Sequence, residues 1–279
     1  MKFSVFTAST PEWEPAQAAA NLAAQGWDGI EWRITDQEQT DVPGFWAGNR
    51  ATWPLTGLEG SLDEIARITR DAGLEFSGIG GYARCDNHAD VDRMLSATAA
   101  LGARQVRVTV PSRGGGDYRE VFAAVRSDLE RAADRAAHHG VKALIELHHG
   151  TVSASASAAL RLVDGLDPAH IGVIHDLGNL VIEGQEDHVS AFQLLGEYLA
   201  HIHVKNVGWY PGDVVDGVTT WQARWAPLAD GVADVDAYFR ELETVGYDGW
   251  VTIEDFSTEL PLEQRTRENL AFLRAAARV

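Results

Sequence analysis

Short apolar segments alternate with alanine-rich segments along the whole chain, and this alternation limits the folds open to it. The apolar segments have the length and composition of buried strands. They are residues 2–7, 29–34, 75–79, 105–110, 142–148, 171–176, 199–205 and 250–256. The segments between them repeat apolar residues at helical spacing. They are residues 15–25, 61–73, 88–102, 118–139, 154–165, 187–198, 234–245 and 262–278.

Eight strand–helix units in 279 residues predict an α/β fold of the (β/α)8 type, a TIM barrel. A doubly wound open sheet is the alternative, but it would need fewer units or a second domain. No break in composition marks a boundary, so we expect a single barrel domain over residues 1–279. Glycines that precede the next strand indicate where five of the helices end: Gly26, Gly73, Gly102, Gly140 and Gly246.

The charge and the cysteine content narrow the class of protein. With 41 acidic and 23 basic residues, the chain has a net charge of −18, which disfavours nucleic acid as a partner. The one cysteine, Cys85, rules out an internal disulfide and is typical of a reducing compartment. We find no signal-peptide pattern and no stretch of the roughly 18 apolar residues that a membrane span needs. We therefore expect a cytoplasmic protein without a membrane partner, and leave a homo-oligomer open.

Side chains that can bind a metal stand at the ends of four successive predicted strands. Glu146 lies at the end of the fifth strand, Asp176 of the sixth, His203 of the seventh and Glu254 of the eighth. In a barrel of parallel strands, all of these ends meet at the carboxyl-terminal face, where such enzymes carry out their chemistry. Each residue alone is more often solvated or structural. Their joint occurrence at equivalent points predicts one metal site.

Three carboxylates and one imidazole form a hard, oxygen-rich ligand set. Such a set favours Mn²⁺, with Mg²⁺ or Co²⁺ as alternatives, over a thiolate-bound structural zinc. The remaining coordination positions would hold two neighbouring oxygens of a polyol or hydroxyketone. A metal placed there polarises a carbonyl and makes the neighbouring C–H more acidic, so that a side-chain base can take the proton.

Several motifs resemble those of a known family. The segments ALIELHH, IGVIHDLGN, AHIHVKN, APLADGVADV and GYDGWVTIEDF are together similar to the xylose isomerase-like TIM barrels, the sugar phosphate isomerase/epimerase family. The resemblance spans the chain and is densest from about residue 142 to 256. It is specific for the fold and the metal site, and less so for the substrate. It implies metal binding by the same set as the strand ends: Glu146, Asp176, His203 and Glu254.

The chain departs from the ketohexose 3-epimerases of this family at three positions. Those enzymes have a substrate-holding glutamate, a histidine and an arginine where this chain has Val152, Asn179 and Trp209. The resemblance therefore leaves two activities open. One is a metal-dependent isomerase or epimerase of a sugar or keto-sugar. The other is a lyase that eliminates a β-substituent from a 3-keto-glycoside or dehydrates an inosose-like keto-polyol. A non-catalytic carbohydrate-binding barrel is a third hypothesis.

Candidate catalytic residues lie at the ends of the same strands. Glu146, Glu254 and His148 are candidate bases, because each would lie beside the carbonyl that the metal holds. Lys205 is the candidate for stabilising an enolate oxygen, with an ion pair to a carboxylate as the alternative. We expect Arg107 to be an ion-pair partner in the core, and His149 and His175 to be structural.

Two long segments, residues 35–60 and 206–233, are expected to lie over the catalytic face as lids. They hold five of the nine tryptophans, and an indole ring suits the C–H face of a sugar. Packing of these rings against the barrel is the alternative. The candidate substrate-binding residues are Trp46, Trp209 and Trp225 of these segments, Glu31 and Arg33 at the end of the second strand, and Asn179. Glu31 and Arg33 would reach substrate hydroxyls, with a structural ion pair as the alternative.

Overall fold

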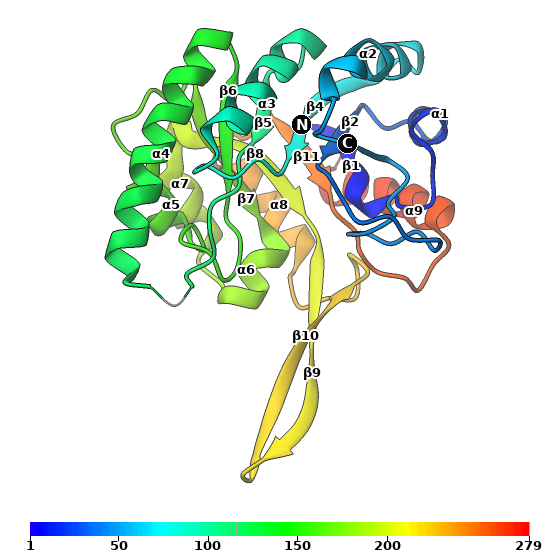
Figure 1. Ribbon diagram of the computed structural model, residues 1–279. Helices are drawn as coiled ribbons and strands as arrows, with labels where there is room; N and C mark the ends of the chain where they lie inside the picture. Colours follow the sequence, from blue (N-terminus) through cyan, green and yellow to red (C-terminus); the bar gives the residue numbers. More distant parts are fainter. Residues whose placement is uncertain (115, 279) are drawn as a thin grey trace.

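Parallel pairing joins eight strands into a closed barrel within residues 1–114 and 116–278, which are the residues that the computed structural model describes (Figure 1). Pairing of β1 with both β11 and β2 closes the ring. Around the barrel the strands are β1 (Lys2–Phe6), β2 (Gly29–Ile34), β4 (Glu75–Gly81), β5 (Gln105–Arg107), β6 (Lys142–Glu146), β7 (Ile171–Asp176), β8 (Leu199–Val204) and β11 (Trp250–Ile253). The short β3 (Thr52–Trp53) pairs with the end of β2.

Helices surround this barrel (Figure 1). They are α1 (Pro15–Gln25), α2 (Leu62–Asp71), α3 (His88–Leu101), α4 (Tyr118–His139), α5 (Ala156–Val163), α6 (Leu177–Glu183), α7 (His188–Leu195), α8 (Val235–Thr244) and α9 (Leu262–Ala276). Each buries an apolar face, as in α8, where Val235, Tyr238, Phe239 and Leu242 are buried. Among the described helices, none combines the length and the apolar content that crossing a membrane requires.

The predicted (β/α)8 barrel is confirmed, and all five helix-ending glycines have positive φ angles between 70° and 90°. Some boundaries differ. β5 ends at Arg107 and β11 at Ile253, three residues earlier than predicted in each case. Helix α6 was not predicted; it begins directly after β7 because the side chain of Asp176 accepts a hydrogen bond from the backbone N–H of Asn179 at 2.8 Å. The domain extent of 1–279 stays a prediction, and Val279 lies outside the described residues.

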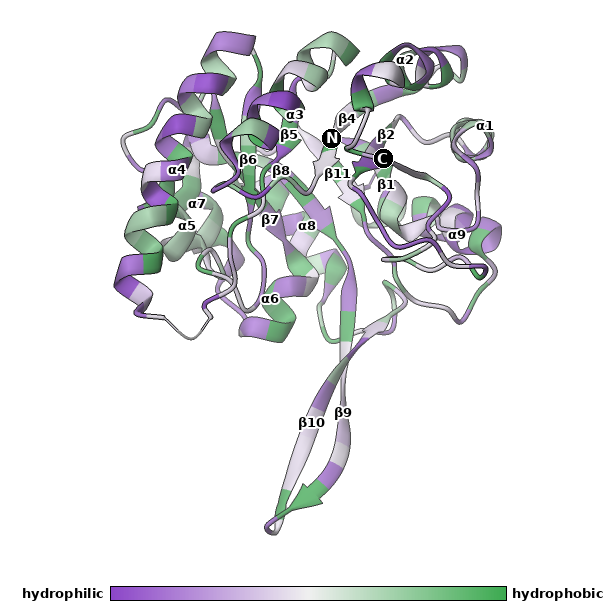
Figure 2. Cartoon of the chain, in the orientation of Figure 1, coloured by the Kyte–Doolittle hydropathy of each residue, from purple (hydrophilic) through white to green (hydrophobic). Residues whose placement is uncertain are grey.

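Most of the segment expected as a second lid, residues 206–233, is a β-hairpin, which the sequence analysis did not predict. Strands β9 (Asn206–Val215) and β10 (Val218–Ala226) pair antiparallel through a two-residue turn at Asp216–Gly217. Both turn residues have positive φ, 51° and 80°, which is the geometry that Asp-Gly turns favour. The hairpin projects away from the barrel, and its tip carries exposed apolar residues (Figures 1 and 2): Val214, Val215 and Val218.

Inside the barrel, one close contact links the packing of the strands to their polar ends. A Cβ atom added to Gly80 on β4 would lie 1.9 Å from Cε2 of Phe6. The Phe6 ring in turn stacks on His203, with 6.1 Å between ring centroids and 22° between planes. Gly80 is therefore needed because the Phe6 ring occupies the space of a side chain.

We predict that Gly80→Ala destabilises the protein by about 1–3 kcal/mol, because the added methyl group overpacks the barrel against Phe6. The measurement is the free energy of urea unfolding of Gly80→Ala, of Gly78→Ala and of the unmodified chain. Gly78→Ala is the matched control on the same strand, since its Cβ would meet nothing closer than 3.5 Å. Equal free energies of unfolding for the two variants would contradict this account of the packing.

Candidate metal and active site

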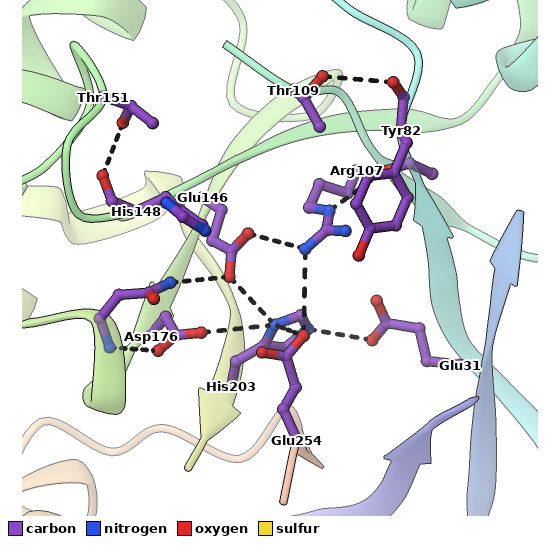
Figure 3. Close-up of polar contacts among 12 residues, drawn as sticks. Glu31, Tyr82, Arg107, Thr109, Glu146, His148, Thr151, Asp176, His203 and Glu254 are labelled. Atoms are coloured by element: carbon purple, nitrogen blue, oxygen red, sulfur yellow. Dashed lines mark hydrogen bonds and ion pairs between the residues drawn. The ribbon is translucent and has the colours of Figure 1, made fainter. Parts of the chain in front are cut away.

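The four predicted ligands converge at the carboxyl-terminal end of the barrel (Figure 3). Their strands are neighbours in the order β6, β7, β8 and β11, and Asp176 is directly opposite His203 in the register. One ligand atom from each of Glu146, Asp176, His203 and Glu254 lies within 4.8 Å of the others, and all four residues are buried. The alignment of parallel strands thus brings together side chains that are far apart in the sequence.

Two buried cations contact these carboxylates. The Nζ of Lys205 donates to Asp176 Oδ2 at 2.5 Å and also to Glu254 Oε2. The Nη1 of Arg107 donates to Glu146 Oε2 at 2.8 Å (Figure 3). Burial opposes the charge on each cation. The carboxylates outweigh it at Lys205, and Tyr82 together with the carboxylates outweighs it at Arg107, so the pKa of both groups is raised and both stay protonated.

His203 has its two ring nitrogens on different partners. Nε2 lies 3.2 Å from Glu31 Oε2, whereas Nδ1 lies 3.1 Å from Glu254 Oε1 and 3.6 Å from Glu146 Oε1. Burial lowers the pKa of His203, but the carboxylates of Glu254 and Glu31 more than offset this and raise it well above its usual value. No hydrogen bond within the described residues satisfies Nδ1, although the atom is buried.

The three ligand carboxylates differ in their preference for a proton. Burial raises the pKa of each, but Lys205 and His203 bring that of Glu254 down to about 2. Arg107 and His203 likewise hold the pKa of Glu146 well below its usual range. For Asp176, burial together with Glu146 and Glu254 raises the pKa despite the contact with Lys205. The raised pKa of Asp176 reflects burial and the repulsion among the three carboxylates, and a cation bound between them would relieve that repulsion.

A cavity of about 260 Å³ opens beside this cluster. Glu146, Glu254 and Lys205 form its polar end, and Trp46 and Tyr82 supply aromatic surface. The remaining lining residues are Arg107, Val108, Thr109, Val110, Ser112, His148 and Thr151. Because metal-competent residues and a cavity are adjacent, a bound molecule could contact both.

His148 lines the cavity in a form suited to accept a proton. Its Nδ1 lies 2.9 Å from the backbone carbonyl oxygen of His149. A carbonyl only accepts hydrogen bonds, so Nδ1 carries the hydrogen and Nε2 of the neutral ring keeps its lone pair. The ring is held in place by stacking on His149, with 4.5 Å between centroids. This geometry agrees with the predicted role of a base.

The other predicted substrate contacts are divided between the cavity and its surroundings. Trp46 lines the cavity, and Trp225 packs near it, with the Lys205 Nζ 5.6 Å from the centre of its ring. Asn179 does not line the cavity; its amide donates to Glu146 Oε1 at 3.2 Å and its oxygen contacts His149 Nδ1. Trp209 lies on the hairpin, 39% exposed, and donates to a backbone carbonyl of α6.

Glu31 and Arg33, expected to contact substrate hydroxyls, are buried and bound to other side chains. Glu31 contacts two histidines, and Arg33 donates to Gln37 and Thr52. Neither of them is among the residues that line the cavity. The alternative of a structural role fits their contacts better, because the Glu31 carboxylate and the Nη1 atom of Arg33 contact side chains within the protein.

Among the lining residues that sequence reasoning did not place at the site, Tyr82 and Arg107 bear most on its chemistry. Tyr82 follows β4, and its ring lies 4.4 Å from the guanidinium of Arg107 (Figure 3). Arg107 makes the ion pair that was expected, yet it also lines the cavity, where its buried Nη2 has no partner among the described residues. For Arg107 a signal was available in the sequence. It lies two residues after Gln105 on β5, so both polar side chains are on the same face of the strand.

Comparison with known proteins identifies the family. The model of the xylose isomerase-like TIM barrels matches residues 19–276. The chain belongs to this family. The predicted resemblance is therefore confirmed for nearly the whole of the chain.

Curated relatives match a part of the chain. The inosose dehydratase of Geobacillus thermodenitrificans (strain NG80-2) is 30% identical over 132 residues, which are 45% of this chain and 44% of that protein. The inosose dehydratase of Lacticaseibacillus casei is 29% identical over 134 residues, with the same two shares. The chain thus spans less than half the length of the curated relatives that it matches.

Solved structures match the whole barrel at low identity. A 3-keto-D-glucoside 4-epimerase from E. coli has a TM-score of 0.72 and 17% identity, covering 99% of both chains. A D-psicose 3-epimerase, solved in the presence of D-fructose, has a TM-score of 0.74 and 16% identity over 99% of both chains. A probable 3-DHS dehydratase from Bacillus anthracis has a TM-score of 0.69 and 18% identity over 98% of each. At these identities the similarity establishes the fold.

The cluster fits a divalent metal ion by its own chemistry. Three carboxylates and an imidazole are donors that Mn²⁺ and Mg²⁺ accept. The buried Nδ1 of His203, which has no hydrogen-bond partner among the described residues, lies among those carboxylates. Replacing Lys205 tests how strongly these carboxylates need a cation.

We predict that Lys205→Met destabilises the chelator-treated protein by about 3–5 kcal/mol, because it leaves buried carboxylates without their cation. The measurement is thermal and denaturant unfolding in the presence of a chelator. Lys142→Met at the start of β6 is the matched control, since it removes a half-buried lysine outside the cluster. A loss no larger than that of the control would show that Lys205 does not balance the cluster.

Proposed function

We propose that the protein is a divalent-metal-dependent enzyme that isomerises or epimerises a keto-sugar by removing the proton next to its carbonyl. The observation that supports this most is the position of His148 on the cavity wall beside the cluster of Glu146, Asp176, His203 and Glu254. The cavity of about 260 Å³ lies at the small end of ligand pockets, which favours a substrate the size of a monosaccharide.

In this proposal the four clustered residues hold the metal ion, with Mn²⁺ as the preferred ion and Mg²⁺ or Co²⁺ as alternatives. Such an ion, when bound, supplies Lewis-acid polarisation of the substrate carbonyl. His148 Nε2 takes the proton from the neighbouring carbon, because the Nδ1–H of the ring donates to the His149 carbonyl and leaves Nε2 as the nitrogen that can act as the base. Glu146 and Glu254 are the alternative bases, since both line the same cavity.

Cationic donors at the cavity would stabilise the negative charge that develops on the substrate oxygen. Lys205 is among the residues that line the cavity, and Arg107 has the buried Nη2 without a partner among the described residues. Because these donors are fixed in place before the reaction, they cost no reorganisation when the charge forms. Trp46 and Tyr82 would cover the apolar face of the sugar ring.

Dehydration is the second candidate function, favoured by the sequence similarity to inosose dehydratases. It begins with the same proton abstraction. The electron pair of the broken C–H bond then forms a C=C bond, and the β-hydroxyl leaves as water after it accepts a proton. The two candidates differ only in whether the carbanion is reprotonated or expels its β-substituent.

A small carbohydrate is the partner that this proposal requires. A net charge of −18 disfavours nucleic acid as an alternative. The homo-oligomer and the cytoplasmic location stay predictions. For the oligomer, the exposed valines at the tip of the hairpin are the surface to test.

We predict that the protein binds about one Mn²⁺ per chain and that Asp176→Asn weakens this binding roughly tenfold or more, because an amide lacks the charge that a hard cation prefers. The measurement is titration of free Mn²⁺ by electron paramagnetic resonance. Asp255→Asn is the matched control; Asp255 is also buried after β11, but its carboxylate bonds to Asn269 and the Ser257 N–H, outside the cluster. Equal affinities of the two variants would show that Asp176 is only structural.

We predict that His148→Ala keeps its bound metal but lowers kcat by roughly 10²–10⁴-fold, the usual contribution of a general acid–base. His138→Ala, an exposed histidine of α4, is the control. In D₂O, an epimerase places deuterium on the carbon beside the carbonyl. A lyase instead releases its β-substituent and leaves an enone that absorbs in the ultraviolet. Transfer of hydrogen between carbons without solvent exchange would contradict proton abstraction by any side chain.

A further inference from the structure

Glu31 lies behind the metal cluster and joins two histidines of the same strand. It belongs to β2, which β1 and β11 separate from β8 around the barrel, and is 1% exposed. Its Oε2 lies 2.9 Å from His201 Nε2 and 3.2 Å from His203 Nε2. A buried carboxylate between two imidazoles fixes which ring nitrogens carry hydrogen, because a carboxylate only accepts.

Gln105 determines which ring nitrogen of His201 carries the hydrogen, because it contacts Nδ1 while Glu31 contacts Nε2. Gln105 donates from Nε2 to the carbonyl oxygen of Ser77 at 2.8 Å, which fixes the orientation of the amide group. The same Nε2 lies 2.9 Å from His201 Nδ1. An NH₂ group only donates, so Nδ1 of His201 is the acceptor and its Nε2 carries the hydrogen. That hydrogen points to Glu31, with the Thr252 hydroxyl 2.9 Å away as a second acceptor.

This orientation argues against a second metal site on the same residues. Glu31, His201 and His203 lie close enough together to be ligands. However, Nε2 of neutral His201 carries a hydrogen and has no lone pair for a metal. A neutral imidazole also has only one ring nitrogen with a lone pair for a metal. His203 therefore cannot bind one metal ion with Glu31 and His201 and another with Glu146, Asp176 and Glu254.

The same carboxylate determines how His203 faces the candidate ligands. Its Nε2–H donates to Glu31, so when the ring loses a proton to bind a metal ion, the lone pair forms on Nδ1. Nδ1 is the nitrogen that lies near Glu146 and Glu254 and has no hydrogen bond among the described residues. A ligand histidine whose other nitrogen donates to a carboxylate is held in one tautomer and one ring orientation.

We propose that Glu31 is a positioning residue: through its hydrogen bond with His203 Nε2 it presents Nδ1 as the metal-binding atom, and the Gln105–His201 pair holds Glu31 in place. The inference rests on the proposed metal site and assigns Glu31 a role other than substrate contact. Consecutive hydrogen bonds thus connect the Ser77 carbonyl, through Gln105, His201 and Glu31, to the proposed metal ligand His203.

The most direct test is ¹⁵N NMR of histidine-labelled protein loaded with Zn²⁺ or Mg²⁺. We expect His203 as the Nε2–H tautomer, with the signal of Nδ1 shifted by the metal, and His201 also as the Nε2–H tautomer. The His203 signals are assigned by their loss in His203→Gln. Metal coordination through His203 Nε2, or an Nδ1–H tautomer of His201, would overturn the inference.

The second test is the Mn²⁺ affinity of Glu31→Gln, measured by electron paramagnetic resonance titration. We expect a dissociation constant raised roughly 10–100-fold, as for removal of a carboxylate that orients a ligand histidine. Glu75→Gln on β4, an exposed glutamate paired with Lys2, is the control and keeps its affinity. Should Glu31→Gln fail to fold, Gln105→Met removes the amide donor at similar volume and is expected to weaken binding by a smaller factor.

The results separate this inference from the proposed function. An unmodified chain that binds no Mn²⁺ would contradict the metal site itself. Normal binding in the unmodified chain, with unchanged affinity in Glu31→Gln or in the substitute Gln105→Met, would overturn the role of Glu31 and leave the metal site intact.

Discussion

A cluster of four carboxylates is buried at one end of this barrel, and the arrangement around them is a response to that constraint. Glu31, Glu146, Asp176 and Glu254 are each at most 6% exposed. Unpaired buried charges are strongly unfavourable, so each must find a cation or a hydrogen-bond donor. Lys205 and Arg107 supply charge, and the histidines of β8 supply N–H groups. The structure thus maintains, at a cost in stability, a site that attracts a further cation.

Function is the simplest reason to keep such a cluster. A well-packed apolar core would be as stable as a buried ion-pair network, or more so. The same end of the barrel also holds the cavity and, on its wall, a histidine whose Nδ1 donates to a backbone carbonyl. The family of the xylose isomerase-like barrels is established for the chain, and the metal-dependent proton abstraction remains our proposal for this member.

The sequence predicted the barrel and the four clustered residues because both follow from regular spacing. Strand–helix alternation repeats eight times, and parallel strands place equivalent residues at one face. Glu146, Asp176, His203 and Glu254 lie at equivalent points, so their convergence could be deduced without any knowledge of side-chain contacts. His148 also came from this logic, as the next residue of the same parity after Glu146.

Contacts across the barrel could not be deduced in this way. The bond between Glu31 on β2 and His203 on β8 depends on the barrel diameter and the side-chain rotamers, which strand periodicity does not determine. The lining of the cavity by Tyr82 and Arg107 has the same origin. The hairpin, in contrast, could have been predicted from the sequence. The Asp-Gly pair at 216–217, flanked by valines, is a strong signal for a hairpin turn, and the sequence analysis did not use it.

The central claim is that the strand ends of β6, β7, β8 and β11 bind one divalent ion. Anomalous diffraction at the manganese absorption edge, from crystals soaked in Mn²⁺, tests it most directly. We expect one strong peak per chain, within bonding distance of Glu146, Asp176, His203 Nδ1 and Glu254. A soaked crystal without a peak there, or with its peak between Glu31 and His201 instead, would contradict the account.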